Sequence, residues 1–106
     1  MSIDELADGL LAKAASNESG RSSVTVYSRP GARLRQTLIA LAAGQVMGEY
    51  KSPGDASVLC LRGRVVLRAG DAERELGPGD LLAVPPQRHD IRALELSVLL
   101  LTVALH

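Results

Sequence analysis

Glycine and proline recur so often after residue 20 that no long helix fits into the rest of the chain. Clusters of turn-forming residues stand at positions 28–31, 52–55, 69–71 and 77–80. Short apolar and β-branched runs, about nine of them, lie between these clusters at a regular spacing. This pattern is typical of an all-β barrel or sandwich, and we expect one here.

The turns define the segments that we expect to form strands. They are Val24–Tyr27, Leu34–Ala42, Gln45–Tyr50, Ala56–Arg62, Arg64–Arg68, Ala72–Leu76, Leu81–Val84, Arg88–Leu94 and Leu96–Leu105. The last of these segments is apolar at nearly every position, so we expect it to be buried on both faces of its sheet.

The beginning of the chain has helical character instead. Ser2 and Glu5 form a capping box at the start of an expected helix, Ile3–Ser16. Gly9 within this helix costs on the order of 1 kcal/mol relative to alanine, so the helix needs a packing partner. The apolar residues that share one helical face can supply that contact: Ile3, Leu6, Leu10 and Ala14.

Length and composition bound the class of protein. A chain of 106 residues is the usual size of one domain, in which we expect residues 1–20 to form the N-terminal helix and residues 21–106 the barrel. The chain contains no Trp and no Phe, so its core must be aliphatic. Twelve basic residues balance twelve acidic ones, which is not the charge pattern of a nucleic-acid-binding protein, and we expect no nucleic-acid partner.

The same features indicate a soluble cytoplasmic protein. Cys60 is the single cysteine, which excludes an internal disulfide, and its position between two leucines suggests a buried thiol in a reducing compartment. The acidic residues within the first 20 positions do not fit a secretory signal. The longest apolar stretch, Val98–Leu105, is far shorter than the roughly 20 residues that span a bilayer, so we expect no membrane partner.

The stretch from Gly79 to His89 combines a Gly-Asp turn, a short apolar strand, a proline pair and a histidine. It resembles the second signature motif of the cupin superfamily, and Gly44 and Gly63 frame the first motif at the spacing that this family uses. The resemblance covers about residues 34–105, and the short chain with an N-terminal helix looks like a subgroup of single-domain bacterial cupins of unsettled function. It implies a cupin double-stranded β-helix, or jelly-roll barrel, with one short N-terminal α-helix.

The residues that bind metal in a typical cupin are mostly replaced. A metal-binding cupin supplies two histidines and an acid from the first motif and one histidine from the second. In this chain Tyr50 and Ser52 stand at the two histidine positions, and Ala56 stands at the position of the acid, with Asp55 one residue away. Of the four positions, only the one matched by His89 keeps its metal-binding residue type.

We therefore expect no metal and no other cofactor. A metal bound despite these replacements would use His89 with Glu49 or Asp55. A shift of one residue along a strand turns a side chain to the opposite face, so Asp55 would need a bulge to face the barrel.

The resemblance places His89 inside the barrel, with Arg88 beside it to assist an anion. By the same alignment Tyr50 faces inward and Ser52 lies nearby, so these four residues form the predicted ligand-binding site, an interior pocket. No catalytic set of residues is evident. Two simpler interpretations stay open: His89 is a buried histidine hydrogen-bonded to the backbone or to Tyr50, and Tyr50 fills the volume of the lost metal site.

Three functions remain open at this point. The first is a metal-free binding or sensing module for a small molecule. The second is a metal-dependent enzyme of the dioxygenase or isomerase type, for which His89 and Tyr50 are the available acid–base pair. The third is an interaction protein with a filled barrel. In all three cases we expect a homodimer, with the N-terminal helix across or beside the interface.

One segment has an asymmetric charge. Residues 21–35 contain four arginines and no acid; the arginines are Arg21, Arg29, Arg33 and Arg35. They can form an anion-binding patch, or pair with the acidic helix of the same chain or of a partner chain, and pairing is the default expectation.

Overall fold

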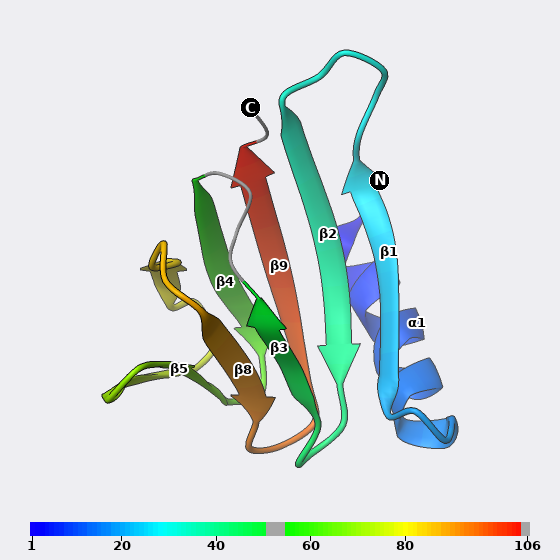
Figure 1. The fold of residues 1–106 in the computed structure, drawn as a ribbon. Helices are drawn as coiled ribbons and strands as arrows, with labels where there is room; N and C mark the ends of the chain where they lie inside the picture. Colours follow the sequence, from blue (N-terminus) through cyan, green and yellow to red (C-terminus); the bar gives the residue numbers. More distant parts are fainter. Residues whose placement is uncertain (51–54, 105–106) are drawn as a thin grey trace.

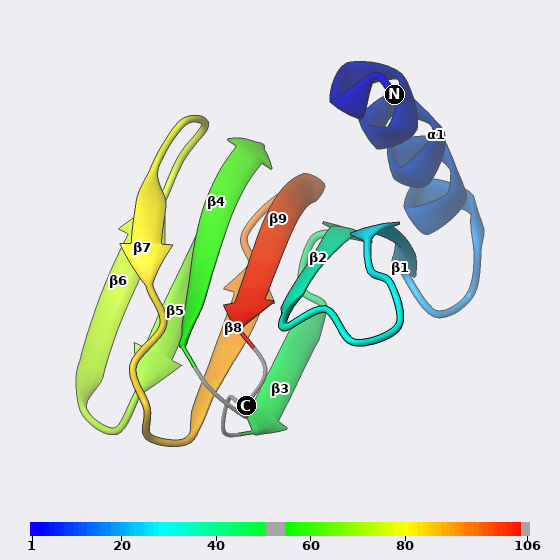
Figure 2. The ribbon, with the colours of Figure 1, turned by 90° about the horizontal axis from the view of Figure 1, so that it is seen from above.

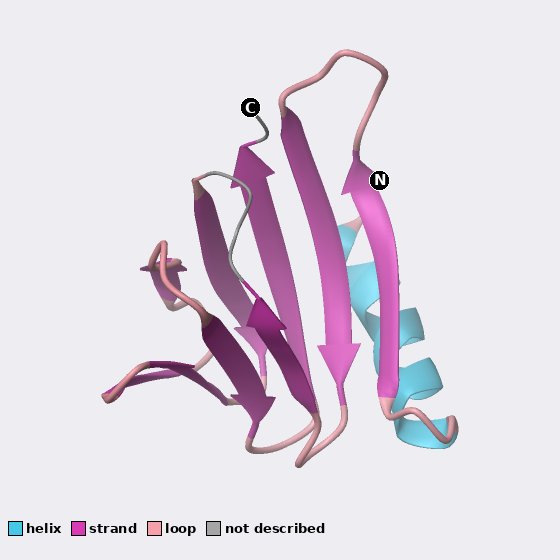
Figure 3. Cartoon of the chain, in the orientation of Figure 1, coloured by secondary structure: helices cyan, strands magenta, loops and turns pink. Residues whose placement is uncertain are grey.

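The computed structural model describes residues 1–50 and 55–104, without the side chains of Glu49 and Tyr50. Within this part the chain forms one helix, α1 (Ile3–Ser16), followed by nine strands. The strands are β1 (Arg21–Tyr27), β2 (Leu34–Leu41), β3 (Val46–Tyr50), β4 (Ala56–Arg62), β5 (Val65–Ala69), β6 (Ala72–Leu76), β7 (Leu81–Ala83), β8 (His89–Ala93) and β9 (Ser97–Ala104). Figure 3 shows the helix, in cyan, beside the strands, in magenta.

The strands form two antiparallel sheets that face each other. Sheet A has the strand order β1-β2-β9-β4-β7, and sheet B has the order β3-β8-β5-β6. Figure 1 shows sheet B in front of sheet A, and Figure 2 shows the two sheets from above, with α1 outside sheet A. This arrangement confirms the predicted all-β class and the jelly-roll barrel with one N-terminal helix.

Helix α1 has the predicted bounds and the predicted N-cap. The Ser2 hydroxyl accepts a hydrogen bond of 3.2 Å from the backbone N–H of Glu5, which satisfies one of the free donors at the helix start. The helix packs through its buried face on the outer side of sheet A; the buried residues of this contact are Ala7, Leu10, Ala14, Leu38, Ala40 and Val98. No helix among the described residues has the length and apolar character needed to cross a membrane.

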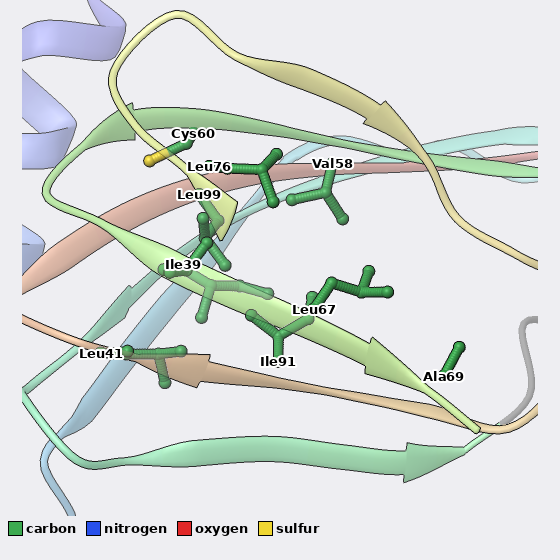
Figure 4. Packing of buried hydrophobic residues seen from close by; sticks show 11 residues of the cluster. Ile39, Leu41, Val58, Cys60, Leu67, Ala69, Leu76, Ile91 and Leu99 are labelled. Atoms are coloured by element: carbon green, nitrogen blue, oxygen red, sulfur yellow. The ribbon is translucent and has the colours of Figure 1, made fainter. Parts of the chain in front are cut away.

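The main core fills the space between the two sheets (Figure 4). Its buried residues are Ile39, Leu41, Val58, Cys60, Val65, Leu67, Ala69, Leu76, Ile91, Ala93 and Leu99. Strand β9 contributes to the main core and to the contact with α1. Leu99 faces the barrel interior, and Val98 lies beneath α1. The predicted burial of this strand on both faces is therefore confirmed for this pair of residues.

Most strands begin and end close to the expected positions. The largest difference is β1, which starts at Arg21 instead of Val24. Its first residues are polar, but they pair with β2 in a continuous register that places Arg21 opposite Leu41. Backbone pairing with an apolar neighbour thus extends the strand beyond its own β-branched residues.

Two acidic residues of α1, Asp4 and Asp8, pair with β4. Arg62, at the end of that strand, binds the Asp8 carboxylate through Nη1 and lies 3.7 Å from the Asp4 carboxylate through Nη2. The predicted pairing of these acids with the arginines of residues 21–35 is therefore wrong within one chain. Arg21 instead donates a hydrogen bond to the backbone carbonyl of Val46.

Candidate ligand-binding site

His89 begins β8 and is 4% exposed. It alternates in phase with Ile91 and Ala93, which lie in the main core, so the strand directs it toward the barrel as expected. Its Nδ1 atom lies 3.1 Å from the carbonyl oxygen of Gln87. Because a carbonyl oxygen can only accept, Nδ1 is the donor in this hydrogen bond.

The two motifs meet at the pair of strands β3 and β8. Tyr50 is the register partner of His89, so the backbones of two positions that bind metal in a typical cupin lie directly opposite each other. The Tyr50 side chain and the whole of Ser52 lie outside the described part of the chain. Their roles in ligand binding stay predictions.

A hollow of about 560 Å³ lies beside His89. It is bounded by the β5–β6 hairpin and by the first residues of β8. Its lining residues are Arg68, Gly70, Asp71, Glu73, Arg88, His89 and Asp90. Two of the four predicted ligand-binding residues, Arg88 and His89, thus line one hollow together.

This hollow lies on the outer side of sheet B. Arg68 alternates with the core residue Leu67, and Asp90 alternates with the core residue Ile91, so both face away from the barrel interior. The ligand site predicted for Arg88 and His89 lies inside the barrel, whereas the hollow that they line opens on the opposite face of sheet B.

An ion pair organises the floor of the hollow. The Arg68 guanidinium contacts both carboxylate oxygens of Asp90, with Nη2–Oδ2 at 3.1 Å and Nε–Oδ1 at 3.3 Å. The Asp90 side chain is only 11% exposed, and the fork geometry of the contact favours this burial of a charge. Gly48 of β3 packs closely here: a Cβ atom at this residue would lie 2.9 Å from Asp90 Cα.

The sequence motifs did not point to Arg68, Asp90 or the two other acids of the hollow, Asp71 and Glu73. The signal for Arg68 was present, because apolar residues alternate along β5 and leave it on the outer face. Asp90 gave no such signal, since it becomes a site residue only through its pairing with Arg68 across two strands. The lining carries charges of both signs and suits a polar ligand.

The donor atoms in this region do not fit a transition-metal centre. Within residues 1–50 and 55–104, no group of three or more His, Cys, Asp and Glu side chains is placed to hold a metal ion. Asp55 is exposed and precedes β4, and the Glu49 side chain lies outside the described residues. Our prediction that the chain binds no metal stays a prediction.

Cys60 lies in the main core and is fully buried. Burial raises the pKa of its thiol, and the negative charge of Asp80 adds to this increase. The side chain is therefore a neutral thiol near pH 7, and its position suits core packing rather than nucleophilic chemistry.

Solved structures from bacteria share this architecture. A cupin superfamily protein from Desulfitobacterium hafniense is 25% identical over 88% of this chain and 87% of its own, with a TM-score of 0.77. A conserved protein of unknown function from Streptococcus pyogenes is 27% identical over 85% of this chain and 78% of its own, with a TM-score of 0.75. A protein of unknown function from Rhizobium leguminosarum matches at 17% identity over 92% of both chains, with a TM-score of 0.70.

No protein-family model and no curated protein matches the chain. The structural matches nevertheless agree with the motifs at Gly44–Gly63 and Gly79–His89. The chain has the cupin jelly-roll fold and is similar to small bacterial cupins, as its motifs implied.

Proposed function

We propose that this cupin-fold chain is a metal-independent binding module for a small polar molecule, held in the hollow beside His89. The observation that carries this proposal is the hollow itself, whose volume of about 560 Å³ falls within the usual range for small-molecule sites. Its lining is charged and includes the buried Asp90 side chain, which is paired with Arg68.

The chemistry of the lining favours a ligand with both hydrogen-bond donors and acceptors, such as an amino acid or a hydroxy acid. Asp90 orients the Arg68 guanidinium, so the guanidinium already has a fixed position before a ligand binds. Arg88 adds a second cation, while Asp71 and Glu73 offer carboxylate acceptors.

A ligand screen tests this proposal. Amino acids, hydroxy acids and sugars are added at millimolar concentration to protein treated with a chelator, and thermal unfolding is followed. A ligand that binds the native state at 100 times its Kd stabilises it by about 2.7 kcal/mol, which appears as a rise in Tm. We expect at least one compound to raise the Tm, and a metal-loaded sample to gain nothing further.

The matched variants are Arg88→Gln and Arg29→Gln. Both remove one exposed arginine, but only Arg88 lines the hollow. We expect the first variant to lose most of the ligand-induced rise and the second to keep it. A screen without any stabilising compound, or equal behaviour of the two variants, would reject the binding site. Stoichiometric metal in protein purified without chelators would favour the enzyme alternative instead.

The filled barrel supports a second candidate, the interaction protein. Partly buried residues from several parts of the barrel pack against the core between the sheets; they are Met47, Leu82, Val84 and Leu101. An outer surface would then carry the function. In that case the ligand screen gives no stabilisation, while a partner captured on the outer face of sheet B is lost on substitution of Arg68 by Gln.

A further inference from the structure

A second hollow lies at the seam between the two sheets. Strand β6 ends sheet B and β7 ends sheet A, and the two strands lie at the same side of the barrel (Figure 2). Between them is a hollow of about 190 Å³. Residues from both strands, from β5 and from the β7–β8 connection line it; they include Leu67, Ala69, Ala72, Arg74, Leu82 and Gln87.

This seam hollow is separate from the hollow beside His89. Arg74 is the register partner of Leu67, and Ala72 is the register partner of Ala69, so the four residues belong to the inner face of sheet B. The hollow beside His89 instead uses Glu73, which alternates to the outer face.

The seam hollow combines apolar walls with a single cation. Leu67 and Ala69 are buried, Leu82 is partly buried, and the alanine side chains leave space beside the leucines. Arg74 is the one charged side chain in the described lining. Among the ion pairs of residues 1–50 and 55–104, none includes Arg74.

The acids nearest to Arg74 in the chain are directed elsewhere. Glu73 and Glu75 flank it on β6 and alternate to the outer face, where Glu75 pairs with Arg64 at 2.8 Å. A cation at the rim of an apolar hollow is complementary to a ligand with a negative head and an apolar body.

We propose that the seam hollow binds a small monocarboxylate with a compact apolar group, of the size of benzoate. The apolar group packs between Leu67 and Leu82, and the carboxylate accepts hydrogen bonds from the guanidinium of Arg74. The volume agrees with this size, since an apolar cavity of about 150 Å³ is known to accommodate benzene. A different role for Arg74, an inward charge that prevents pairing of the β6 edge with another chain, predicts no preference for carboxylates.

The test is a titration of methyl-labelled protein with benzoate and with benzyl alcohol, its neutral counterpart, followed by NMR. We expect the methyl signals of Leu67, Ala69 and Leu82 to shift with a Kd of about 1 mM for benzoate, and about tenfold weaker binding of benzyl alcohol. Arg74→Gln should weaken benzoate about tenfold and leave benzyl alcohol unchanged. The control variant is Arg92→Gln, which removes an exposed arginine from the outer face of sheet B.

A second variant tests the hollow independently of charge. Ala72 is exposed at the start of β6, so Ala72→Leu can fill the hollow without entering the main core. It should abolish the shifts caused by both probes, while the signals of α1 confirm the native fold. Absence of shifts in the wild-type protein at about 20 mM benzoate, or equal affinity for both probes, would overturn the proposal. Such a failure does not affect the proposal for the hollow beside His89, because that proposal is tested with other ligands and with Arg88→Gln.

Discussion

Gly63 lies at the turn between β4 and β5, where the chain passes very close to the start of β9. Its φ angle is +79°, a region that favours glycine. A Cβ atom at this residue would lie 2.5 Å from the carbonyl oxygen of Leu96 and 2.8 Å from Ser97 Cα. The closing glycine of the first motif is therefore required both by its backbone conformation and by a backbone contact.

Gly63→Ala should lower the free energy of unfolding by about 3 kcal/mol, because strain at a positive φ adds to a clash with backbone that has little freedom to move. Gly44→Ala is the matched control. Gly44 also has a positive φ, of +86°, but a Cβ atom there meets nothing within 4 Å. Its cost should be about 1 kcal/mol, from strain alone. Urea unfolding of both variants measures the difference, and equal costs would show that the contact at Gly63 is easily relieved.

Cys60 makes stability depend on pH in the alkaline range. Its pKa is raised in the folded state by burial and by Asp80, so the folded protein retains the thiol proton more strongly than the unfolded chain does. The contribution is fully present below the unfolded thiol pKa of about 8.5 and is lost as the pH rises through the folded pKa. The free energy of unfolding should therefore fall above about pH 8.5.

Cys60→Ala separates this effect from other alkaline titrations. The variant loses some packing at every pH, but its stability should decline less steeply than that of the wild type between about pH 8.5 and pH 10. Denaturant unfolding at several pH values gives both curves. Parallel curves for the two proteins would contradict the assignment of a raised pKa to Cys60.

At the scale of elements, α1 has one position at which a substitution should increase the stability of the protein. Gly9 is exposed within the helix, and a Cβ atom there would meet nothing within 4 Å. Gly9→Ala should therefore raise the free energy of unfolding by about 0.5–1 kcal/mol, since alanine has the higher helix propensity. Ser2→Ala is the opposing control, because it removes the N-cap hydrogen bond and should cost about 1 kcal/mol. A neutral result for both variants would mean that α1 is not part of the cooperative unfolding unit.

The elements themselves were largely predictable from local patterns. Ala56–Arg62 and Ala72–Leu76 have the expected bounds, because glycine-containing turns delimit them and partial alternation marks the second. The start of β1 was not predictable in this way. Arg21–Ser23 are polar and join the strand only because β2 offers them backbone partners, and a local pattern carries no information about such a partner.

At the scale of the whole molecule, the candidate site was predictable only in part. The motif alignment found His89 and Arg88, since their signature is contiguous in the chain. Arg68 and Asp90 are 22 residues apart, and their ion pair exists because β5 and β8 are neighbours in sheet B. The side of sheet B on which the hollow opens also depends on which of the alternating side chains point into the barrel. Packing between the two sheets determines this, and a local sequence pattern does not contain it.

The expected homodimer also belongs to this scale. Strand β1 is at the end of sheet A, pairs only with β2 among the described strands, and carries the exposed residues Val24 and Tyr27. An edge strand with exposed apolar side chains is suited to pairing with a second copy, and α1 lies beside it (Figure 1). Light scattering at micromolar concentration should give about 22 kDa, twice the 11.2 kDa of one chain.

Val24→Lys places a charge on this edge and should shift the protein to the mass of one chain, because a charge on an edge strand opposes pairing. Lys13→Glu, an exposed charge change on α1, is the control. A wild-type mass of one chain at micromolar concentration would refute the dimer, and a dimer that Val24→Lys leaves intact would place the interface elsewhere.

The contact between α1 and sheet A also determines how the protein tolerates shortening. Leu38, Ala40 and Val98 are shielded from water in the presence of the helix. A proteolytic product that begins after Ser16 keeps every strand but exposes this apolar surface to the solvent. The exposed surface then favours association with other copies of the chain. The first turns of the chain thus cover an apolar face of the barrel, although they contribute no residue to either hollow.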